Sequence, residues 1–412
     1  MSAALADPVE VVNFGCRLNI AEGEAIRTAA RQAGVRDMIV FNSCAVTDEA
    51  VRQARQAVRR ALRERPEAAV VVTGCAAELE AERFAEMGAR VVRNDAKGLA
   101  ESYGGARTFT NSRAYAPALS GADHARAFLG VQTGCSHSCT FCATVLARGI
   151  ARSATIDAVL ASARTALERG QREIILTGVD LASYGDDSGT ALAALVEALL
   201  DLPLERLRLS SLDPNRIDEA LFALLTTEAR IMPHVHLSLQ AGDDMVLTRM
   251  KRRHRRADAV SLVARLKNAR PEIAIGADLI AGFPTEDDAM FANSLALIDD
   301  CDIVFGHIFP YSPRDGTPAA RMPQVGRAIA RDRAGQLREA NARRRQSWLD
   351  AQVGGTADML VERDGLSGHA GNFAALTLTA PAVPGSIITV RLTARDGDRM
   401  IAAPIEAKDI AA

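Results

Sequence analysis

The stretch Gly134-Cys-Ser-His-Ser-Cys-Thr-Phe-Cys-Ala143 carries three cysteines, Cys135, Cys139 and Cys142, in the spacing C-x3-C-x2-C. It directly follows an apolar run that is typical of a β-strand. Three thiolates on one tight loop can ligate three irons of a four-iron cluster and leave the fourth iron open. Because an open iron can bind a small molecule and pass it an electron, this loop predicts redox catalysis.

Zinc and a disulfide are the alternative uses of these thiols. A structural zinc site needs four ligands, and here the fourth would have to be His137 or a distant residue. The chain has seven cysteines in 412 residues, which is a sparse and odd number. Met1 to Glu10 also lack the pattern of a signal peptide, so we favour a cluster over both alternatives.

Length and composition set the outer limits of the interpretation. A chain of 412 residues predicts two or three domains, and a hydrophobic content of 48% is enough for packed cores. No apolar stretch approaches the roughly 20 residues of a membrane helix, so we expect a cytoplasmic protein without a membrane partner. The net charge is −2, so a nucleic-acid partner would have to bind local basic patches.

Residues 1–118 alternate short apolar runs with helical stretches. In chain order these are Val9–Phe14, Ala21–Ala33, Met38–Phe41, Val51–Arg65 and Ala69–Val72. Strand–helix–strand alternation predicts a flavodoxin- or Rossmann-like parallel α/β domain.

One cysteine follows each apolar run of this first segment, namely Cys16, Cys44 and Cys75. The carboxyl ends of parallel strands share one edge of a sheet, so three thiols that are distant in sequence could meet there. Small buried cysteines behind the strands are the alternative. The polar and glycine neighbours of all three cysteines favour exposed turns.

Residues 119–348 form a longer βα series after a polar linker, Gly121-Ala-Asp-His124. The strand candidates are Phe128–Gln132, Glu173–Leu176, Arg206–Ser210, His234–Leu239, Ile273–Ile280 and Ile303–Phe309. Six strands are fewer than the eight of a closed barrel, so we expect an open partial (βα)6 barrel with its active residues at the strand carboxyl ends. Residues 349–412 alternate with turns at Asp364-Gly365 and Asp396-Gly397, which predicts a small all-β domain.

Further motifs accompany the cysteines in all three segments. They are Asn13-Phe-Gly-Cys-Arg-Leu-Asn19, Phe41-Asn-Ser-Cys-Ala-Val-Thr47, Val72-Thr-Gly-Cys-Ala76, Leu237-Ser-Leu-Gln-Ala-Gly242, Ala277-Asp-Leu-Ile-Ala-Gly-Phe-Pro-Thr-Glu286, His307-Ile-Phe-Pro-Tyr-Ser-Pro-Arg314 and Gly368-His-Ala-Gly-Asn-Phe373. In this order the chain resembles the radical S-adenosylmethionine methylthiotransferases over nearly its whole length, and its last segment resembles their TRAM module. The resemblance is greatest to the branch that acts on threonylcarbamoyladenosine in tRNA.

The chain departs from the family pattern after the third cysteine. The family typically has an Ile-Pro-aromatic stretch there, whereas this chain has Ala143-Thr-Val-Leu-Ala-Arg-Gly149. The arginine-rich run that usually follows is thinned to Ile150-Ala-Arg-Ser-Ala154.

The resemblance implies cofactors and ligands. Two [4Fe–4S] clusters would be held by Cys135, Cys139 and Cys142 and by Cys16, Cys44 and Cys75. The first cluster would cleave S-adenosylmethionine to a deoxyadenosyl radical, and the second would provide the site for a sulfur or methylthio group. The product would be a methylthio group on C2 of N6-threonylcarbamoyladenosine next to the anticodon. A flavodoxin- or ferredoxin-type reductant protein and a sulfur source would be needed as partners.

The resemblance also implies contacts to S-adenosylmethionine. Gly178, Val179 and Asp180 match the family's motif for its amino group, and a carboxylate beside an ammonium is physically sensible. A helix cap is the alternative role of Asp180. Phe141, Ser211, Gln240 and Asp278 are further candidate contacts, with an ordinary loop role as the alternative.

A basic block is the main candidate for RNA binding. Its members are Arg249, Lys251, Arg252, Arg253, Arg255 and Arg256. Such a block can contact phosphates, although a solvated surface is a common explanation for clustered arginines. The TRAM-like segment is expected to add RNA affinity.

Three other functions stay open at this point. Two are sibling methylthiotransferases, which act on isopentenyl-adenosine in tRNA or on an aspartate of a ribosomal protein. The third, of a different class, is a non-catalytic iron–sulfur RNA-binding redox sensor.

Overall fold

The computed structural model describes residues 8–104 and 115–405. Its N-terminal unit is a four-stranded parallel sheet with strands β1 (Val9–Asn13), β2 (Met38–Ser43), β3 (Ala69–Gly74) and β4 (Arg90–Val91). The accompanying helices are α1 (Arg17–Gln32), α2 (Asp48–Glu64), α3 (Cys75–Leu79), α4 (Ala81–Glu86) and the 3₁₀ turn η1 (Ala100–Ser102). The predicted parallel α/β domain is confirmed. Its strands cross the sheet in chain order, whereas flavodoxin and Rossmann sheets reverse once.

Apolar helix faces fix this sheet from both sides. Ile26 of α1 packs in one buried layer, and Val51 and Val58 of α2 pack in the layer on the other face. Helix α2 begins where the Thr47 hydroxyl accepts a hydrogen bond from the backbone N–H of Ala50 at 3.1 Å. Because the strands are parallel, the turns that follow β1, β2 and β3 lie along one edge of the sheet.

The central unit is an open barrel of six parallel strands, as the sequence predicts. In barrel order they are β6 (Arg126–Gly130), β9 (Glu173–Thr177), β10 (Arg206–Leu209), β11 (His234–Gln240), β12 (Ala274–Ala281) and β13 (Ile303–Pro310). The short β5 (Ala118–Leu119) pairs antiparallel with β6, and β7 (Gln132–Thr133) pairs with β8 (Arg152–Ser153). Isolated bridges join Leu207 of β10 to Ile231, before β11, and Leu212, after β10, to Leu237 of β11, so the six strands form one curved wall.

Helices cover the outside of this wall. They are α6 (Ile156–Glu168), α7 (Leu192–Leu200), α8 (Glu219–Thr227), α10 (Arg256–Ala269), α11 (Asp288–Asp300) and α12 (Arg327–Asp350). Shorter helices and turns lie in the loops: α5 (Thr144–Arg148), η2 (Leu181–Ser183), η3 (Pro214–Arg216), α9 (Asp244–Arg249) and η4 (Pro318–Arg321). One large hydrophobic core joins the strands and helices, in which the alternating apolar residues of each strand pack under the helices.

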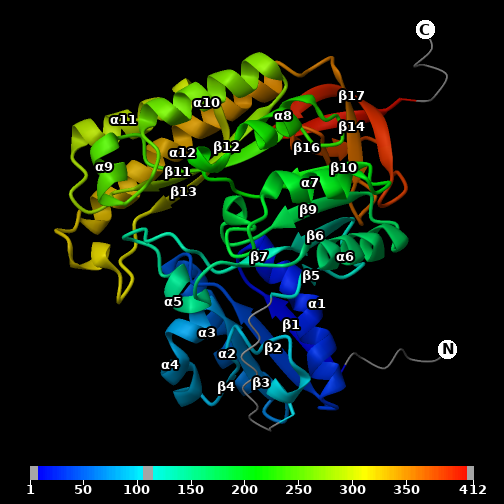
Figure 1. Cartoon of the computed structure of the whole chain (residues 1–412), viewed down its shortest axis with the longest axis vertical. Coiled ribbons are helices and arrows are strands. Elements are labelled where there is room, and N and C mark those ends of the chain that lie inside the picture. Colours follow the sequence, from blue (N-terminus) through cyan, green and yellow to red (C-terminus); the bar gives the residue numbers. More distant parts are fainter. Residues whose placement is uncertain (1–7, 105–114, 406–412) are drawn as a thin grey trace.

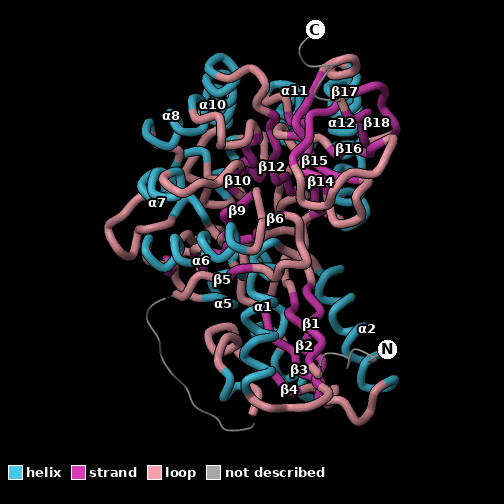
Figure 2. The backbone as a smooth tube through the Cα atoms, turned by 90° about the vertical axis from the view of Figure 1, so that its right-hand side faces the viewer, coloured by secondary structure: helices cyan, strands magenta, loops and turns pink. Residues whose placement is uncertain are grey.

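The C-terminal unit is a closed five-stranded barrel. Its strands are β14 (Thr356–Val361), β15 (Ser367–Ala370), β16 (Ala375–Leu378), β17 (Ile387–Asp396) and β18 (Arg399–Pro404), closed in the order β14-β15-β16-β18-β17. The predicted small all-β domain is therefore confirmed. In Figures 1 and 2 the sheet of β1–β4 lies at the bottom, the partial barrel lies above it and the closed barrel lies at the upper right.

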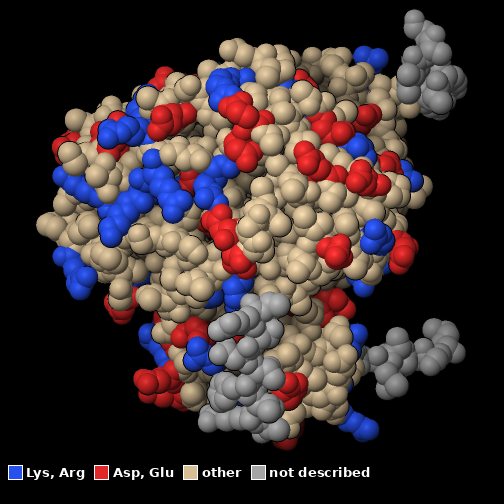
Figure 3. Space-filling model, viewed as in Figure 1, with Lys and Arg blue, Asp and Glu red and all other residues tan. Residues whose placement is uncertain are grey.

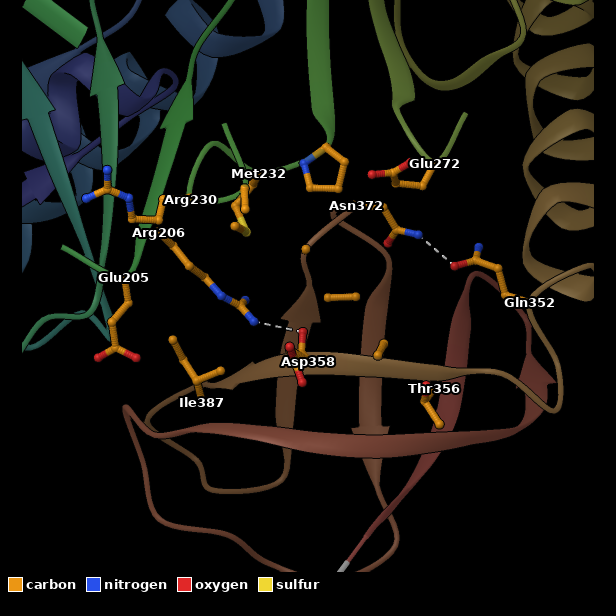
Figure 4. A pocket seen from close by; sticks show the side chains of 15 residues that line it. Glu205, Arg206, Arg230, Met232, Glu272, Gln352, Thr356, Asp358, Asn372 and Ile387 are labelled. Carbon is orange, nitrogen blue, oxygen red and sulfur yellow. Dashed lines mark hydrogen bonds between the residues drawn. The ribbon is translucent and has the colours of Figure 1, made fainter. Parts of the chain in front are cut away.

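A groove of about 550 Å³ separates the closed barrel from the base of the partial barrel (Figure 4). Arg206 crosses it and donates a hydrogen bond to the carbonyl oxygen of Asp358 at 2.9 Å. At its other end Asn372 donates to the Gln352 side chain at 2.7 Å. The Arg206 contact attaches the closed barrel directly to the partial barrel, whereas the Asn372 contact lies within the C-terminal unit.

Candidate functional site

The loop that carries Cys135, Cys139 and Cys142 follows β7 at the carboxyl end of the first barrel strand. All three cysteines are free thiols of intermediate burial. Burial and the neighbouring charges of Asp180, Cys142 and Cys139 raise the pKa of the Cys135 thiol to about 12. Three thiols that repel one another as anions, and that are not disulfide-bonded, fit a shared metal cluster, which supplies the positive charge they lack.

Polar side chains from other strands hold this loop. The Gln132 side-chain oxygen accepts hydrogen bonds from the backbone N–H groups of Val179 and Asp180, each at 3.0 Å. Its amide donates to the Gly134 carbonyl at 2.8 Å. Added to Gly178, a Cβ would lie 2.8 Å from the Gln132 oxygen. Gln132, which the sequence analysis missed, therefore joins the cysteine loop to the 178–180 turn.

Asp180 lies directly beside the first cysteine. Its Oδ2 is 3.6 Å from Cys135 Sγ, 2.9 Å from His137 Nε2 and 2.5 Å from the Ser183 hydroxyl. Burial would raise the pKa of Asp180, but the contacts with His137 and Ser183 hold it below its usual value. An ionised carboxylate at the edge of the cysteine loop can bind an ammonium group. Asp180 is also the residue before η2, although its side chain makes no capping hydrogen bond.

The other predicted cofactor contacts are distributed around the same rim. Phe141 packs edge-on against Phe283 at 6.4 Å between ring centres. Ser211 follows β10, and Gln240 ends β11 with a left-handed φ of 69°. Asp278 differs, because β12 continues to Ala281 and leaves this carboxylate inside the barrel.

Cys16, Cys44 and Cys75 occupy the shared edge of the N-terminal sheet. They lie at the start of α1, after β2 and at the start of α3. A Cβ at Gly15, where φ is 84°, would lie 2.5 Å from Cys44 Sγ, so glycine is required for this close approach. Burial, and then repulsion from Cys16 and Cys75, raise the pKa of Cys44 to about 11. The three distant thiols therefore do meet, and they fit a second cluster.

Arg148 is the centre of the junction between the two thiol groups. Its Nε donates to Cys75 Sγ at 3.1 Å, and its two terminal nitrogens donate to the Glu22 carboxylate at 2.9 and 3.0 Å. Lys97 also donates to Glu22 at 2.6 Å. The Arg148 side chain is only 2% exposed and belongs to the short helix that follows Cys142. One residue thus connects the loop of one thiol group to a sulfur of the other.

The charges of this junction favour an anionic sulfur. Arg148 and Lys97 carry two positive charges and Glu22 one negative charge, so a buried positive charge is left over. Burial would raise the pKa of Glu22, but the two cations hold it at about 2. An anionic cluster held in part by Cys75 would balance the remaining charge.

We expect Arg148→Met to lower the free energy of unfolding by about 3–5 kcal/mol, because it removes one partner of a buried ion network. The thermal midpoint of the anaerobic, iron-loaded protein should fall, with loss of iron. The control Arg60→Met removes an exposed side chain whose nearest carboxylate, Glu64, is 3.9 Å away, and should change stability by no more than about 0.5 kcal/mol. Equal midpoints for the two variants would contradict the role given to Arg148.

The basic block divides into outward and inward residues. Lys251, Arg253 and Arg255 are exposed, and Figure 3 shows basic side chains gathered on the face near α9 and α10. Arg252 is instead 7% exposed and donates to Asp213 at 2.8 Å and to Cys139 Sγ at 3.5 Å. The predicted RNA contact of Arg252 is therefore not supported, because its side chain supports the cysteine loop.

The two remaining members of the basic block, Arg249 and Arg256, also contact other residues of the protein. Arg249 donates to the carbonyl oxygen of Thr285 at 3.3 Å, and Arg256 forms an ion pair with Asp300. Their charges are thus less available to a phosphate than those of Lys251 and Arg253, whereas the exposed Arg255 has the Asp244 carboxylate 3.9 Å away.

Comparisons with known proteins agree with this architecture. Residues 129–298 match the radical SAM superfamily, and residues 8–92 match a family described as uncharacterized protein family UPF0004. Threonylcarbamoyladenosine tRNA methylthiotransferase MtaB of Rickettsia prowazekii is 39% identical over 93% of this chain and 94% of its own length. The MtaB of Bacillus subtilis is 33% identical over 79% and 78%. The tRNA-2-methylthio-N(6)-dimethylallyladenosine synthase of Ruegeria pomeroyi is 31% identical over 88% and 90%.

A solved structure shares the fold. The radical S-adenosylmethionine methyltransferase TsrM from Kitasatospora setae superposes with a TM-score of 0.55 at 15% identity, covering 76% of this chain and 74% of that one. At this identity the likeness concerns the fold alone.

Proposed function

Because the chain belongs to the radical S-adenosylmethionine methylthiotransferase family, we propose that it adds a methylthio group to C2 of N6-threonylcarbamoyladenosine next to the anticodon of tRNA. Similarity to enzymes named for this nucleoside, over nearly the full length of both chains, is the observation that carries the proposal. The dimethylallyladenosine synthases match at lower identity. No observation favours a ribosomal-protein substrate or a non-catalytic redox sensor.

The family uses S-adenosylmethionine and [4Fe–4S] clusters. We assign one cluster to Cys135, Cys139 and Cys142, and a second to Cys16, Cys44 and Cys75. When bound, the first group would supply radical cleavage of S-adenosylmethionine, and the second would supply the site for the sulfur or methylthio group that is transferred. The domain boundaries that we propose are 1–118, 119–348 and 349–412.

The protein's own residues position these groups and neutralise their charge. Gln132 fixes the cysteine loop against the 178–180 turn, where Asp180 is available to an ammonium group. Arg252 and Arg148 each donate a hydrogen bond to one sulfur, at Cys139 and Cys75 respectively. Hydrogen bonds from cationic donors to cluster sulfurs stabilise the more negative reduced state and raise the reduction potential, so both arginines would make electron uptake easier.

The RNA partner is expected on the exposed basic face. Lys251, Arg253 and Arg255 are distant from the cysteine loop in sequence but lie close to it in space, since Thr140 donates to the carbonyl of Arg249 at 2.8 Å. A phosphate bound there would hold the tRNA beside the loop. A flavodoxin- or ferredoxin-type reductant and a sulfur source complete the proposal. Among the described residues, no helix combines the length and apolar character needed to cross a membrane.

Nucleoside mass spectrometry tests the function directly. We expect tRNA from cells lacking this protein to retain threonylcarbamoyladenosine and to lose its methylthio derivative completely. Reintroduction of the gene should restore the derivative, and a Cys139→Ala gene should not. If the derivative persists, or if methylthio-isopentenyl-adenosine disappears in its place, the proposed substrate is wrong.

A further inference from the structure

Arg17 extends from the N-terminal sheet edge toward the interior of the partial barrel. It directly follows Cys16 and is the first residue of α1. Its guanidinium carbon lies 5.3 Å from the centre of the Phe373 ring, which the closed barrel contributes. Within residues 8–104 and 115–405, no hydrogen bond or ion pair joins this half-buried side chain to another residue. A cation–π contact alone is a weak compensation for a partly desolvated guanidinium.

The other guanidinium groups around the same ring already have carboxylate partners. Arg208 lies 5.0 Å from the Phe373 ring centre and bonds to Glu173 at 2.7 Å. Arg126 lies 5.8 Å from the ring centre and pairs with Glu362 at 2.8 Å. Arg17 is therefore the guanidinium of this group that forms no ion pair with a described carboxylate, because Glu173, which acts on its charge, is already bound by Arg208.

The Asp278 carboxylate on β12 also has partners already. Asp278 Oδ1 lies 3.1 Å from His236 Nε2 and 3.3 Å from His307 Nδ1. The centres of the two imidazole rings are 4.6 Å apart, and the His307 side chain is 60% exposed. Because Asp278 is held by two histidines, it is not available to Arg17. The interior next to Cys16 therefore presents an unpaired cation and an accessible imidazole.

We propose that Arg17 is the specificity-determining residue for the substrate's side chain, and that its guanidinium binds the carboxylate of the threonylcarbamoyl group. This inference rests on the proposed function. Threonine is linked through its nitrogen in this nucleoside, so its carboxylate and hydroxyl are free. A dimethylallyl group is apolar and could not pair with Arg17, so an adenosine carrying it would leave the guanidinium unpaired and be rejected.

Three RNA ligands and two Arg17 variants, compared with the wild type, test the inference. Together they remove the charge of Arg17, the charge of the substrate carboxylate, or both. The ligands are anticodon stem–loop RNAs carrying threonylcarbamoyladenosine, its threonine methyl ester, or unmodified adenosine. Dissociation constants and methylthiolation rates are measured anaerobically with full-length, iron-loaded protein. We expect the wild type to bind the free acid about 10- to 100-fold more tightly than the ester, and Arg17→Gln to bind both equally. Arg17→Lys should restore part of the preference.

Matched controls separate this from a folding effect. Arg27→Gln, on the same helix and paired with Glu24, should keep the wild-type preference. Arg17→Gln should still release deoxyadenosine from S-adenosylmethionine, because Arg17 makes no contact with the 135–142 loop.

Each result other than the expected one leads to a single conclusion. If Arg17→Gln weakens binding of all three RNAs equally, Arg17 contacts a phosphate and the inference is overturned. Retention of the acid-over-ester preference in this variant also overturns it. If the wild type methylthiolates none of the RNAs, the proposed function fails, whereas equal modification of the acid by wild type and Arg17→Gln defeats only the inference.

Discussion

Cys139→Ala should abolish the release of deoxyadenosine from S-adenosylmethionine. The three thiols of the 135–142 loop are the proposed ligands of one cluster, and two sulfurs cannot replace three. Arg252, which donates to Cys139 Sγ at 3.5 Å, would lose its sulfur partner as well. Deoxyadenosine formation by anaerobic, reduced protein should therefore fall to the level of cluster-free protein, and iron should fall from about eight to about four atoms per chain.

Cys301→Ala is the matched control for this variant. Cys301 is the seventh cysteine, fully buried after α11 and packed in the main hydrophobic core. Its replacement creates only a small cavity, so iron content and deoxyadenosine release should be retained. Continued deoxyadenosine release by Cys139→Ala, or zinc in place of iron in the 135–142 loop, would contradict the cluster assignment.

The two thiol groups could be predicted from sequence for different reasons. The spacing of Cys135, Cys139 and Cys142 is local, so a tight loop brings them together whatever the rest of the chain does. The prediction that Cys16, Cys44 and Cys75 meet required the strand–helix alternation, because only parallel strands place three distant turns on one edge. Both predictions depended on a periodic or fixed spacing, which a sequence displays directly.

Residues that act through their orientation could not be predicted in this way. Six basic residues lie between positions 249 and 256, and nothing in their order marks Arg252 as the inward one. The chain reverses there because Lys251 adopts a left-handed φ of 57° and His254 is buried against the Leu239 carbonyl. Arg148 likewise lacks a pattern, because its partners Glu22 and Cys75 are more than 70 residues away.

Asp278 shows that placing a residue in a strand does not give the partners of its side chain. The predicted strand Ile273–Ile280 already contains Asp278, which the family resemblance makes a candidate contact to S-adenosylmethionine. In the structure its carboxylate lies in the interior between His236 and His307. These partners come from the neighbouring strands β11 and β13, and they cannot be read from β12 alone.

Cys44→Ala should separate the two reactions. The variant should continue to cleave S-adenosylmethionine, because Gln132, Asp180 and Arg252 hold the 135–142 loop without contact to Cys44. Methylthiolation of tRNA should be lost, since Cys16 and Cys75 alone cannot retain the second cluster. Iron should again fall to about four atoms per chain, and liquid chromatography with mass spectrometry would follow deoxyadenosine and the modified nucleoside in one reaction.

The comparison of the two cysteine variants gives this experiment its strength. Both should lose half of the iron, yet only Cys44→Ala should retain cofactor cleavage, so iron loss by itself cannot explain the difference. Cys301→Ala provides the same chemical change without either loss. Iron that stays near eight atoms per chain in Cys44→Ala would mean that Cys44 is not a ligand. Loss of cofactor cleavage along with methylthiolation would mean that the junction around Arg148 makes the two clusters one cooperative unit.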